Sequence, residues 1–214
     1  MRLKIIYVLL FVCPFTYNTQ AQNKVRFGIK AGFNTAHFNT SIALPSQFSV
    51  RDDPFFYAGG EVEVKIGKHF SLQPELFYVE YSAMEGVSAS ERLKQICIPV
   101  LAKIHVGKIA FYGGPQIDLL LKAEQEYFNA AQQRRLKINT TDSSFTKAGL
   151  SVVGGIEWTF RYKFGLDLRY VFGMSNRCAK DGITFLTGFE EGQKIKINCL
   201  QAGLYYRFGK KPKA

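Results

Sequence analysis

Long apolar runs are missing from this sequence beyond its first residues. No stretch of about 18 apolar residues follows residue 21, so that part of the chain holds no candidate transmembrane helix. Histidine is scarce, with three residues, and none of the four cysteines has the Cys-x-x-Cys spacing of redox motifs or zinc sites. These absences exclude a helical membrane protein and leave a thiol-redox or zinc centre without support. They do not exclude a membrane β-barrel, because its strands are short and of mixed polarity.

The N-terminus has the features of a secretory signal peptide. Arg2 and Lys4 precede the apolar run IIYVLLFV, and Ala21 is a small residue at the cleavage position. We therefore expect a signal peptide over residues 1–21 and a mature chain that has left the cytosol. Losing Arg2 and Lys4 would reduce the formal net charge from +11 to +9.

Three cysteines remain if Cys13 leaves with the signal peptide: Cys97, Cys178 and Cys199. In an oxidising compartment this odd number allows at most one internal disulfide. Cys178 and Cys199 flank the last long connection between predicted strands. We predict that these two form a disulfide and that Cys97 is free.

Eight segments alternate apolar and polar residues with the period of two that predicts β-strands. They cover residues 25–38, 56–67, 70–83, 95–107, 108–123, 147–160, 163–176 and 195–208. Their length of about 12–15 residues exceeds the usual soluble strand of about 5–6. It suits a tilted membrane strand, which needs about 9–11 residues in the hydrocarbon. Within the third segment, Pro74 lacks an amide donor and predicts a bulge.

Short and long connections alternate strictly between these segments. The short ones are residues 68–69, 107–108 and 161–162, and the long ones are residues 39–55, 84–94, 124–146 and 177–194. An up-and-down meander then has all its tight turns at one end, as outer-membrane barrels do at their periplasmic end. We predict an all-β fold, an eight-stranded antiparallel up-and-down transmembrane β-barrel over residues 22–209, followed by a basic periplasmic tail at 210–214.

The alternation alone fits two opposite objects, a soluble secreted barrel with an apolar interior and a membrane barrel with an apolar exterior. Three features favour the membrane barrel. The polar face mixes glycines with long charged side chains, which a narrow eight-stranded lumen needs. Its charges nearly balance, as buried charges must. Aromatic residues gather at strand ends on the apolar face, where interfacial girdles lie.

We predict that the charged residues of the polar face form an ion-pair network in the lumen. The expected members are Arg26, Lys30, Glu61, Glu63, Lys65, Glu75, Lys103, Asp118, Lys122, Glu157, Asp167, Arg169 and Arg207.

The last segment is expected to pair with the first and so remove the open edges of the sheet. Its lipid-facing residues would be Leu200, Ala202, Leu204, Tyr206 and Phe208. This alternation ending in phenylalanine resembles the C-terminal signal that bacterial outer-membrane proteins present to the insertion machinery. The chain departs from the commonest form of that signal, because residues 209–214 follow the phenylalanine.

The mature sequence resembles the PorT-type outer-membrane β-barrel family of the Bacteroidetes. The resemblance is carried by FGIKAGFN, SLQPELFY, ICIPVLAKI, FYGGPQIDLLLKA, LDLRYVFGMSN and LQAGLYYRF, in this order. It implies an eight-stranded barrel in the outer membrane. One branch of that family serves a protein-secretion apparatus, and nothing in these segments singles out that branch.

No group of residues indicates catalysis. Barrel enzymes that act on lipid A need a histidine with a serine and an acid at the outer rim. His69 and His105 fall near the periplasmic end, and only His37 lies toward the exterior. We therefore expect no enzyme activity, no catalytic residue, no cofactor and no metal site.

The leading hypothesis is a structural or interaction barrel whose exterior loops bind an unidentified ligand, with both termini in the periplasm. The basic loop sequence QQRRLKIN favours contact with lipopolysaccharide phosphates over nucleic acid, or serves only to solvate the loop. The expected partners are outer-membrane lipid and lipopolysaccharide, the barrel-insertion machinery and an envelope protein, and the barrel itself would be a monomer. The alternatives are a small porin-like channel and an accessory component of a secretion apparatus.

Overall fold

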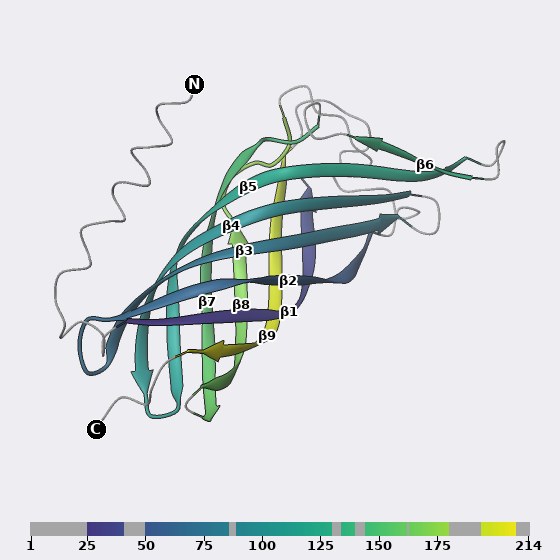
Figure 1. Cartoon of the computed structure of the whole chain (residues 1–214). Helices are drawn as coiled ribbons and strands as arrows, with labels where there is room; N and C mark the ends of the chain where they lie inside the picture. The colour runs from purple at the N-terminus through teal and green to yellow at the C-terminus, as the bar shows by residue number, and fades with distance from the viewer. Residues whose placement is uncertain are drawn as a thin grey trace, which may run out of the picture.

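In the computed structural model, the described residues form a closed antiparallel β-barrel (Figure 1). The structure describes residues 25–40, 50–85, 89–129, 134–139, 144–161, 163–179 and 194–208. The predicted signal peptide and the basic tail at 210–214 lie outside these residues. Within them, no helix is long and apolar enough to cross a membrane.

Nine strands make up the described part of the chain. They are β1 (Val25–Thr40), β2 (Val50–Lys65), β3 (Phe70–Glu85), β4 (Ala89–Val106), β5 (Ile109–Asn129), β6 (Arg134–Asn139), β7 (Ala148–Arg161), β8 (Phe164–Gly173) and β9 (Ile195–Arg207). Eight of them form the barrel wall, in which each strand pairs with the next and β9 pairs back to β1. The prediction of an eight-stranded up-and-down barrel is therefore confirmed. The remaining strand, β6, pairs with β5 alone among the described residues.

The short connections all lie at one end of the barrel, seen at the lower left of Figure 1. They join β2 to β3, β4 to β5, and β7 to β8. The two-residue turn between β4 and β5 depends on Gly107, whose φ of 63° is a left-handed conformation that a residue with a Cβ rarely adopts. Arg207 at the end of β9 pairs with Gly28 near the start of β1, so the first strand begins and the last strand ends at this same turn end.

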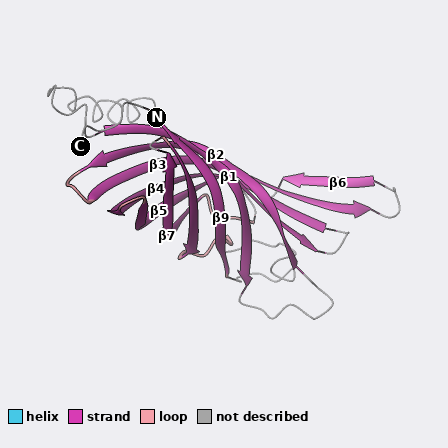
Figure 2. Cartoon of the chain, turned by 90° about the horizontal axis from the view of Figure 1, so that it is seen from below, coloured by secondary structure: helices cyan, strands magenta, loops and turns pink. Residues whose placement is uncertain are grey.

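At the opposite end, β4 and β5 run further than the sequence pattern predicts. β4 begins at Ala89 and β5 ends at Asn129, and β6 lies inside a stretch expected to be loop. Figure 2 shows β5 and β6 projecting past the neighbouring strands. These extensions carry charged residues in sequences such as SERLK and EQE, so they lack the alternation by which the membrane strands were found. They pair through the main chain beyond the apolar belt.

Three register shifts interrupt the ladders, and none falls at Pro74. One lies in β2 between Asp53 and Tyr57, one places an extra residue in β5 opposite Lys94 and Gln95, and one lies in β7. The predicted bulge at Pro74 is wrong. The pairing of β3 with β2 lapses at Gln73 and Pro74 and resumes in the same register, which accommodates the missing amide without an inserted residue.

Inward and outward side chains separate cleanly along the wall. Outward positions are apolar and exposed, as at Phe33 with 70% of its surface exposed and Leu204 with 58%. The aromatic residues predicted for the lipid face, such as Trp158 and Phe208, are among them. Inward-facing side chains are buried, and whether they are polar or apolar depends on their position along the barrel axis. The half near the turns is filled mainly by charged and amide side chains, and the other half mainly by an apolar cluster.

Glycines on the inner wall make room for buried tyrosines. A Cβ on Gly155 would overlap the Tyr112 ring, and Cβ atoms on Gly165 and Gly203 would overlap the ring of Tyr205 and the hydroxyl of Tyr57. Each tyrosine therefore lies over a glycine of another strand, and for Tyr112 and Tyr205 that glycine is the direct cross-strand partner. This packing explains why glycines recur on the polar face of the strands. An aromatic side chain that covers a glycine of a neighbouring strand is a known stabilising arrangement in β-sheets.

Replacing one glycine of an adjacent pair tests this packing. We expect Gly155→Ala to destabilise the barrel by about 1–3 kcal/mol, because the added methyl group collides with Tyr112 and with the Leu168 carbonyl. Gly154→Ala is the matched control, since a Cβ there meets nothing within 4 Å. Urea unfolding in phospholipid vesicles measures both. Equal stability of the two variants would contradict the packing described here.

Candidate functional site

The interior of the barrel near the turn end is organised around one lysine. Lys30 projects inward from β1, and its side chain has no exposed surface. Its Nζ lies 3.3 Å from Glu61, and 3.1 Å from each of Glu75, Glu157 and Asp167. These four carboxylates come from β2, β3, β7 and β8. One ammonium group therefore ties together strands from both sides of the lumen.

Two arginines and a second lysine neutralise the remaining charge of these carboxylates. Arg169 pairs with Glu75 at 2.7 Å and with Asp167 at 2.9 Å, and Arg207 pairs with both Glu61 and Glu157 at 2.6 Å. Lys103 lies 2.7 Å from Glu157. The guanidinium groups also stack on aromatic rings, with Arg207 4.1 Å from the ring centroid of Tyr205.

The cluster is balanced in charge. Below the central residues, Arg26 pairs with Glu63 at 2.6 Å, and Glu63 also lies 3.4 Å from Arg207. We define the lumen cluster as the five cations and five carboxylates joined by these contacts: Arg26, Lys30, Lys103, Arg169, Arg207, Glu61, Glu63, Glu75, Glu157 and Asp167. Burying so many ions is tolerable only because each has a partner of opposite sign.

Two neutral side chains complete the lumen cluster, and the sequence analysis did not count them as members. Gln73 has no exposed surface, donates to Glu61 and Glu75, and accepts from Lys103 at 2.5 Å. The Tyr112 hydroxyl donates to Asp167 at 2.6 Å. Both residues stand on the predicted polar face, so the alternation contained the signal. Neither side chain is charged, so a prediction based on charged residues did not include them.

Ten of the thirteen residues expected in the lumen network belong to this cluster, and three lie elsewhere. Lys65 lies at the turn-end mouth and makes no ion pair among the described residues. Asp118 is buried higher in the lumen, where it accepts hydrogen bonds from Gln116 and Ser151 instead of a cation. Lys122 points out of the barrel and pairs with Glu124 at 2.7 Å. The extra residue in β5 reverses the side-chain alternation before Lys122, which is why its expected inward position is wrong.

The sequence matches one known protein family across most of its length. The match covers residues 20–177, and the family is described as the outer membrane protein beta-barrel domain. The chain belongs to this family. It is therefore an integral outer-membrane β-barrel protein. No curated protein sequence matches it.

Solved outer-membrane barrels share the fold at low sequence identity. Neisserial surface protein A superposes with a TM-score of 0.55 and 15% identity, covering 85% of this chain and 97% of that one. The attachment invasion locus protein Ail of Yersinia pestis gives a TM-score of 0.52 and 11% identity, covering 86% and 99%. The complex of Ail with the heparin analogue sucrose octasulfate gives 0.50 and 10%, with the same coverage. These likenesses show the fold.

The barrel closes where β9 pairs with β1. On β9, Leu200 and Leu204 are exposed on the outer face, with Ala202 between them, and Phe208 follows the strand with an exposed ring. Tyr206 is half-buried because its ring packs against Phe164 and Phe208. The five residues expected on the lipid face of the closing strand thus all point outward.

Cys97, Cys178 and Cys199 are buried in the apolar half of the lumen and form no disulfide with one another. Cys178 and Cys199 therefore do not form the predicted disulfide. Cys178 bridges to Phe145 beyond the end of β8, and Cys199 is an inward residue of β9. The disulfide was predicted because the two cysteines flank one connection in the sequence. In the structure Cys178 lies opposite Phe145, and Cys199 lies opposite Val171 within the barrel wall. Burial also raises the pKa of the Cys178 thiol, which makes it a weak nucleophile.

A serine and a histidine contact Glu63 at the turn-end side of the lumen cluster. His105 Nε2 lies 2.8 Å from the Ser71 hydroxyl and 2.9 Å from a Glu63 oxygen. In a hydrolytic triad the acid binds the opposite ring nitrogen from the one that faces the nucleophile. Here one nitrogen faces both groups, and Ser71 is buried. The arrangement extends the hydrogen-bond network and lacks the geometry of a triad.

Metal binding has no candidate in the described strands and turns. No group of three or more His, Cys, Asp or Glu side chains there is placed to hold a metal ion. The lumen carboxylates instead hold ammonium and guanidinium groups. These ion pairs cross-link strands of the barrel wall near the turn end.

Removing the central cation should weaken the barrel strongly. Lys30→Met leaves four buried carboxylates short of a partner, and we expect a loss of about 3–5 kcal/mol in unfolding free energy. Lys122→Met is the control, because its ion pair is outside the lumen and 45% of the lysine side chain is exposed. That change should cost under about 1 kcal/mol. Urea titration in vesicles decides, and equal losses would show that the lumen cluster does not stabilise the wall.

Proposed function

We propose that this outer-membrane barrel is a plugged structural and interaction protein of the PorT type rather than a channel or an enzyme. The observation that carries the proposal is the four-carboxylate contact of Lys30, which spans the lumen from β1 to β2, β3, β7 and β8. An eight-stranded barrel is only wide enough for its own side chains. With Arg169, Arg207 and Lys103 added, its interior near the turn end is occupied by protein.

The proposed orientation places the tight turns in the periplasm and the long connections outside the cell. It is supported by the sorting of short and long connections to opposite ends, which is typical of outer-membrane barrels. The start of β1 and the end of β9 lie at the turn end, so both termini would be periplasmic. In this orientation the projecting hairpin of β5 and β6 stands on the exterior.

We favour lipopolysaccharide as the exterior ligand, bound through its phosphate groups. The β6 sequence RRLKIN is basic, and arginine pairs with phosphate through two parallel hydrogen bonds. The similar barrel Ail has been solved with sucrose octasulfate, a polyanion. The other partners we propose are the insertion machinery during biogenesis and an envelope protein, with the barrel as a monomer and no role for nucleic acid.

Conductance in planar bilayers tests the plug. We expect the purified barrel to give no stable openings above the lipid baseline, because the lumen cluster blocks the water path with paired, buried ions. A 16-stranded porin inserted under the same conditions serves as the positive control. Large, stable openings would favour the porin-like alternative. Recovery of a stable complex with secretion-apparatus proteins after crosslinking in cells would favour the accessory role.

Lipopolysaccharide binding tests the exterior surface. We expect the triple change Arg134→Gln, Arg135→Gln and Lys137→Gln to weaken binding of the detergent-solubilised barrel to lipopolysaccharide at least tenfold, at about 1 kcal/mol per lost cation. A matched triple change at the same end of the barrel, Lys122→Gln, Lys147→Gln and Lys196→Gln, should leave affinity within about threefold. If both triple variants lost the same affinity for lipopolysaccharide, the effect of the β6 changes would be one of net charge alone. If the β6 variant lost no affinity, β6 would not be part of the binding site.

A further inference from the structure

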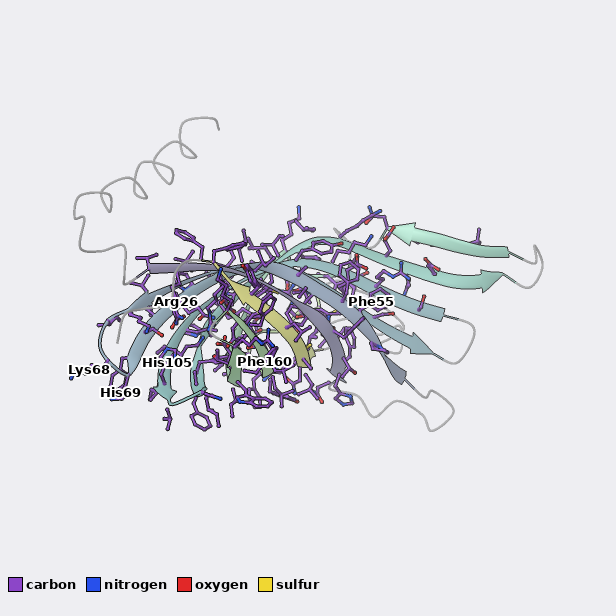
Figure 3. The ribbon with its side chains drawn as sticks, turned by 60° about the horizontal axis from the view of Figure 1, so that its bottom comes forward. Arg26, Phe55, Lys68, His69, His105 and Phe160 are labelled. Carbon is purple, nitrogen blue, oxygen red and sulfur yellow. The ribbon has the colours of Figure 1, made fainter. Side chains whose placement is uncertain are left out.

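A basin of about 870 Å³ opens at the turn end of the barrel. All three tight turns contribute cations to its lining, and β1 contributes one more. These residues are Arg26, Lys65, Lys68, Lys108, Arg161 and Lys163. Figure 3 shows Arg26, Lys68 and His105 gathered at this end of the molecule, with Phe55 far away toward the other end.

Among the described residues, no carboxylate lines the basin. The nearest acid, Glu63, lies behind it in the lumen cluster and already contacts Arg26, Arg207 and His105. Within the described residues, Lys65, Lys68, Lys108 and Arg161 make no ion pair. The five carboxylates of the lumen cluster are matched by its five cations, so they do not neutralise the remaining cations that line the basin. The basin is thus a concave surface of one sign.

Ordinary solvated turns explain single lysines, but they do not explain this enclosure. The cations come from three separate turns and converge on one hollow, where their mutual repulsion is unfavourable without a counter-charge. A cleft lined by one sign of charge concentrates ions of the opposite sign. Its volume also falls within the range of about 300–1,000 Å³ usual for small-molecule sites.

The rim of the basin lies at the level of a membrane interface. Phe160 and Phe164 line it as well, and both rings are exposed on the outer wall, 44% and 46% respectively. Aromatic side chains of this kind mark the head-group level of a bilayer. The cations beside them are therefore placed where phosphate groups are abundant.

We propose that this turn-end basin is a binding site for a phosphate-bearing anion. The ligand chemistry is a phosphate held by lysine ammonium groups and by the Arg161 guanidinium, and its source is either the head group of an anionic phospholipid or a soluble phosphate. The site does not depend on the proposed exterior function, because it lies at the opposite end from β6. It also does not depend on which leaflet the turns face, since both carry phosphate.

Binding to phosphatidylglycerol and to inorganic pyrophosphate distinguishes the two sources. The full barrel in a non-ionic detergent is analysed by native mass spectrometry for retained phosphatidylglycerol and, separately, by calorimetry with pyrophosphate. We expect binding of phosphatidylglycerol over phosphatidylcholine, or of pyrophosphate, or of both. The triple change Lys65→Gln, Lys68→Gln and Arg161→Gln should weaken whichever is bound at least tenfold, and added salt should weaken it further.

The matched control removes three cations from the other end, by Lys122→Gln, Lys147→Gln and Lys196→Gln. It should keep affinity for the probe within about threefold of wild type. Unchanged urea unfolding of both triple variants shows that each still folds. Binding of neither probe overturns the proposal, and so does equal weakening by the basin and control triples. Loss of lipopolysaccharide binding in the β6 variant has no bearing on this result.

Discussion

Charge neutrality inside a narrow, water-poor lumen is the constraint on which this structure depends. Lys30 can remain ionised there only because four carboxylates surround it, and those carboxylates can remain ionised only because Arg169, Arg207 and Lys103 complete the balance. The glycines beneath Tyr112 and Tyr205 provide the space that these side chains need. The apolar exterior follows from the lipid, but the register of the strands is fixed by which charges meet within.

The interior has two zones with different physical bases. Near the turns it is ionic, and near the long connections it contains an apolar cluster that includes Val79, Leu93 and Ile197. The ionic zone determines which side chains must face one another, because an unpaired ion there is costly. The apolar zone is filled by packing and tolerates exchange of similar side chains more readily.

The alternation of the membrane strands predicted the fold well, since lipid on one side and a filled lumen on the other impose a strict period of two. It also placed residues such as Lys30, Glu157 and Arg207 on the inner face. It failed where that constraint ends. The charged ends of β4 and β5 and the whole of β6 pair in water, where no period is imposed. Lys122 was misplaced because the sequence alternation does not reveal the extra residue in β5. The apolar zone was not predicted, although Val79, Val153 and Val171 stand at inward positions of their strands.

The strands that hold the lumen cluster divide it in an unexpected way. β1 to β4 carry three of its cations and three of its carboxylates, and β5 to β9 carry two of each. The cluster residues of each half are thus balanced in charge by themselves, yet the contacts Arg169–Glu75, Arg207–Glu61 and Lys103–Glu157 all cross between the halves. The three contacts therefore join the two halves across the lumen, while the cluster residues of each half keep their own charge balance.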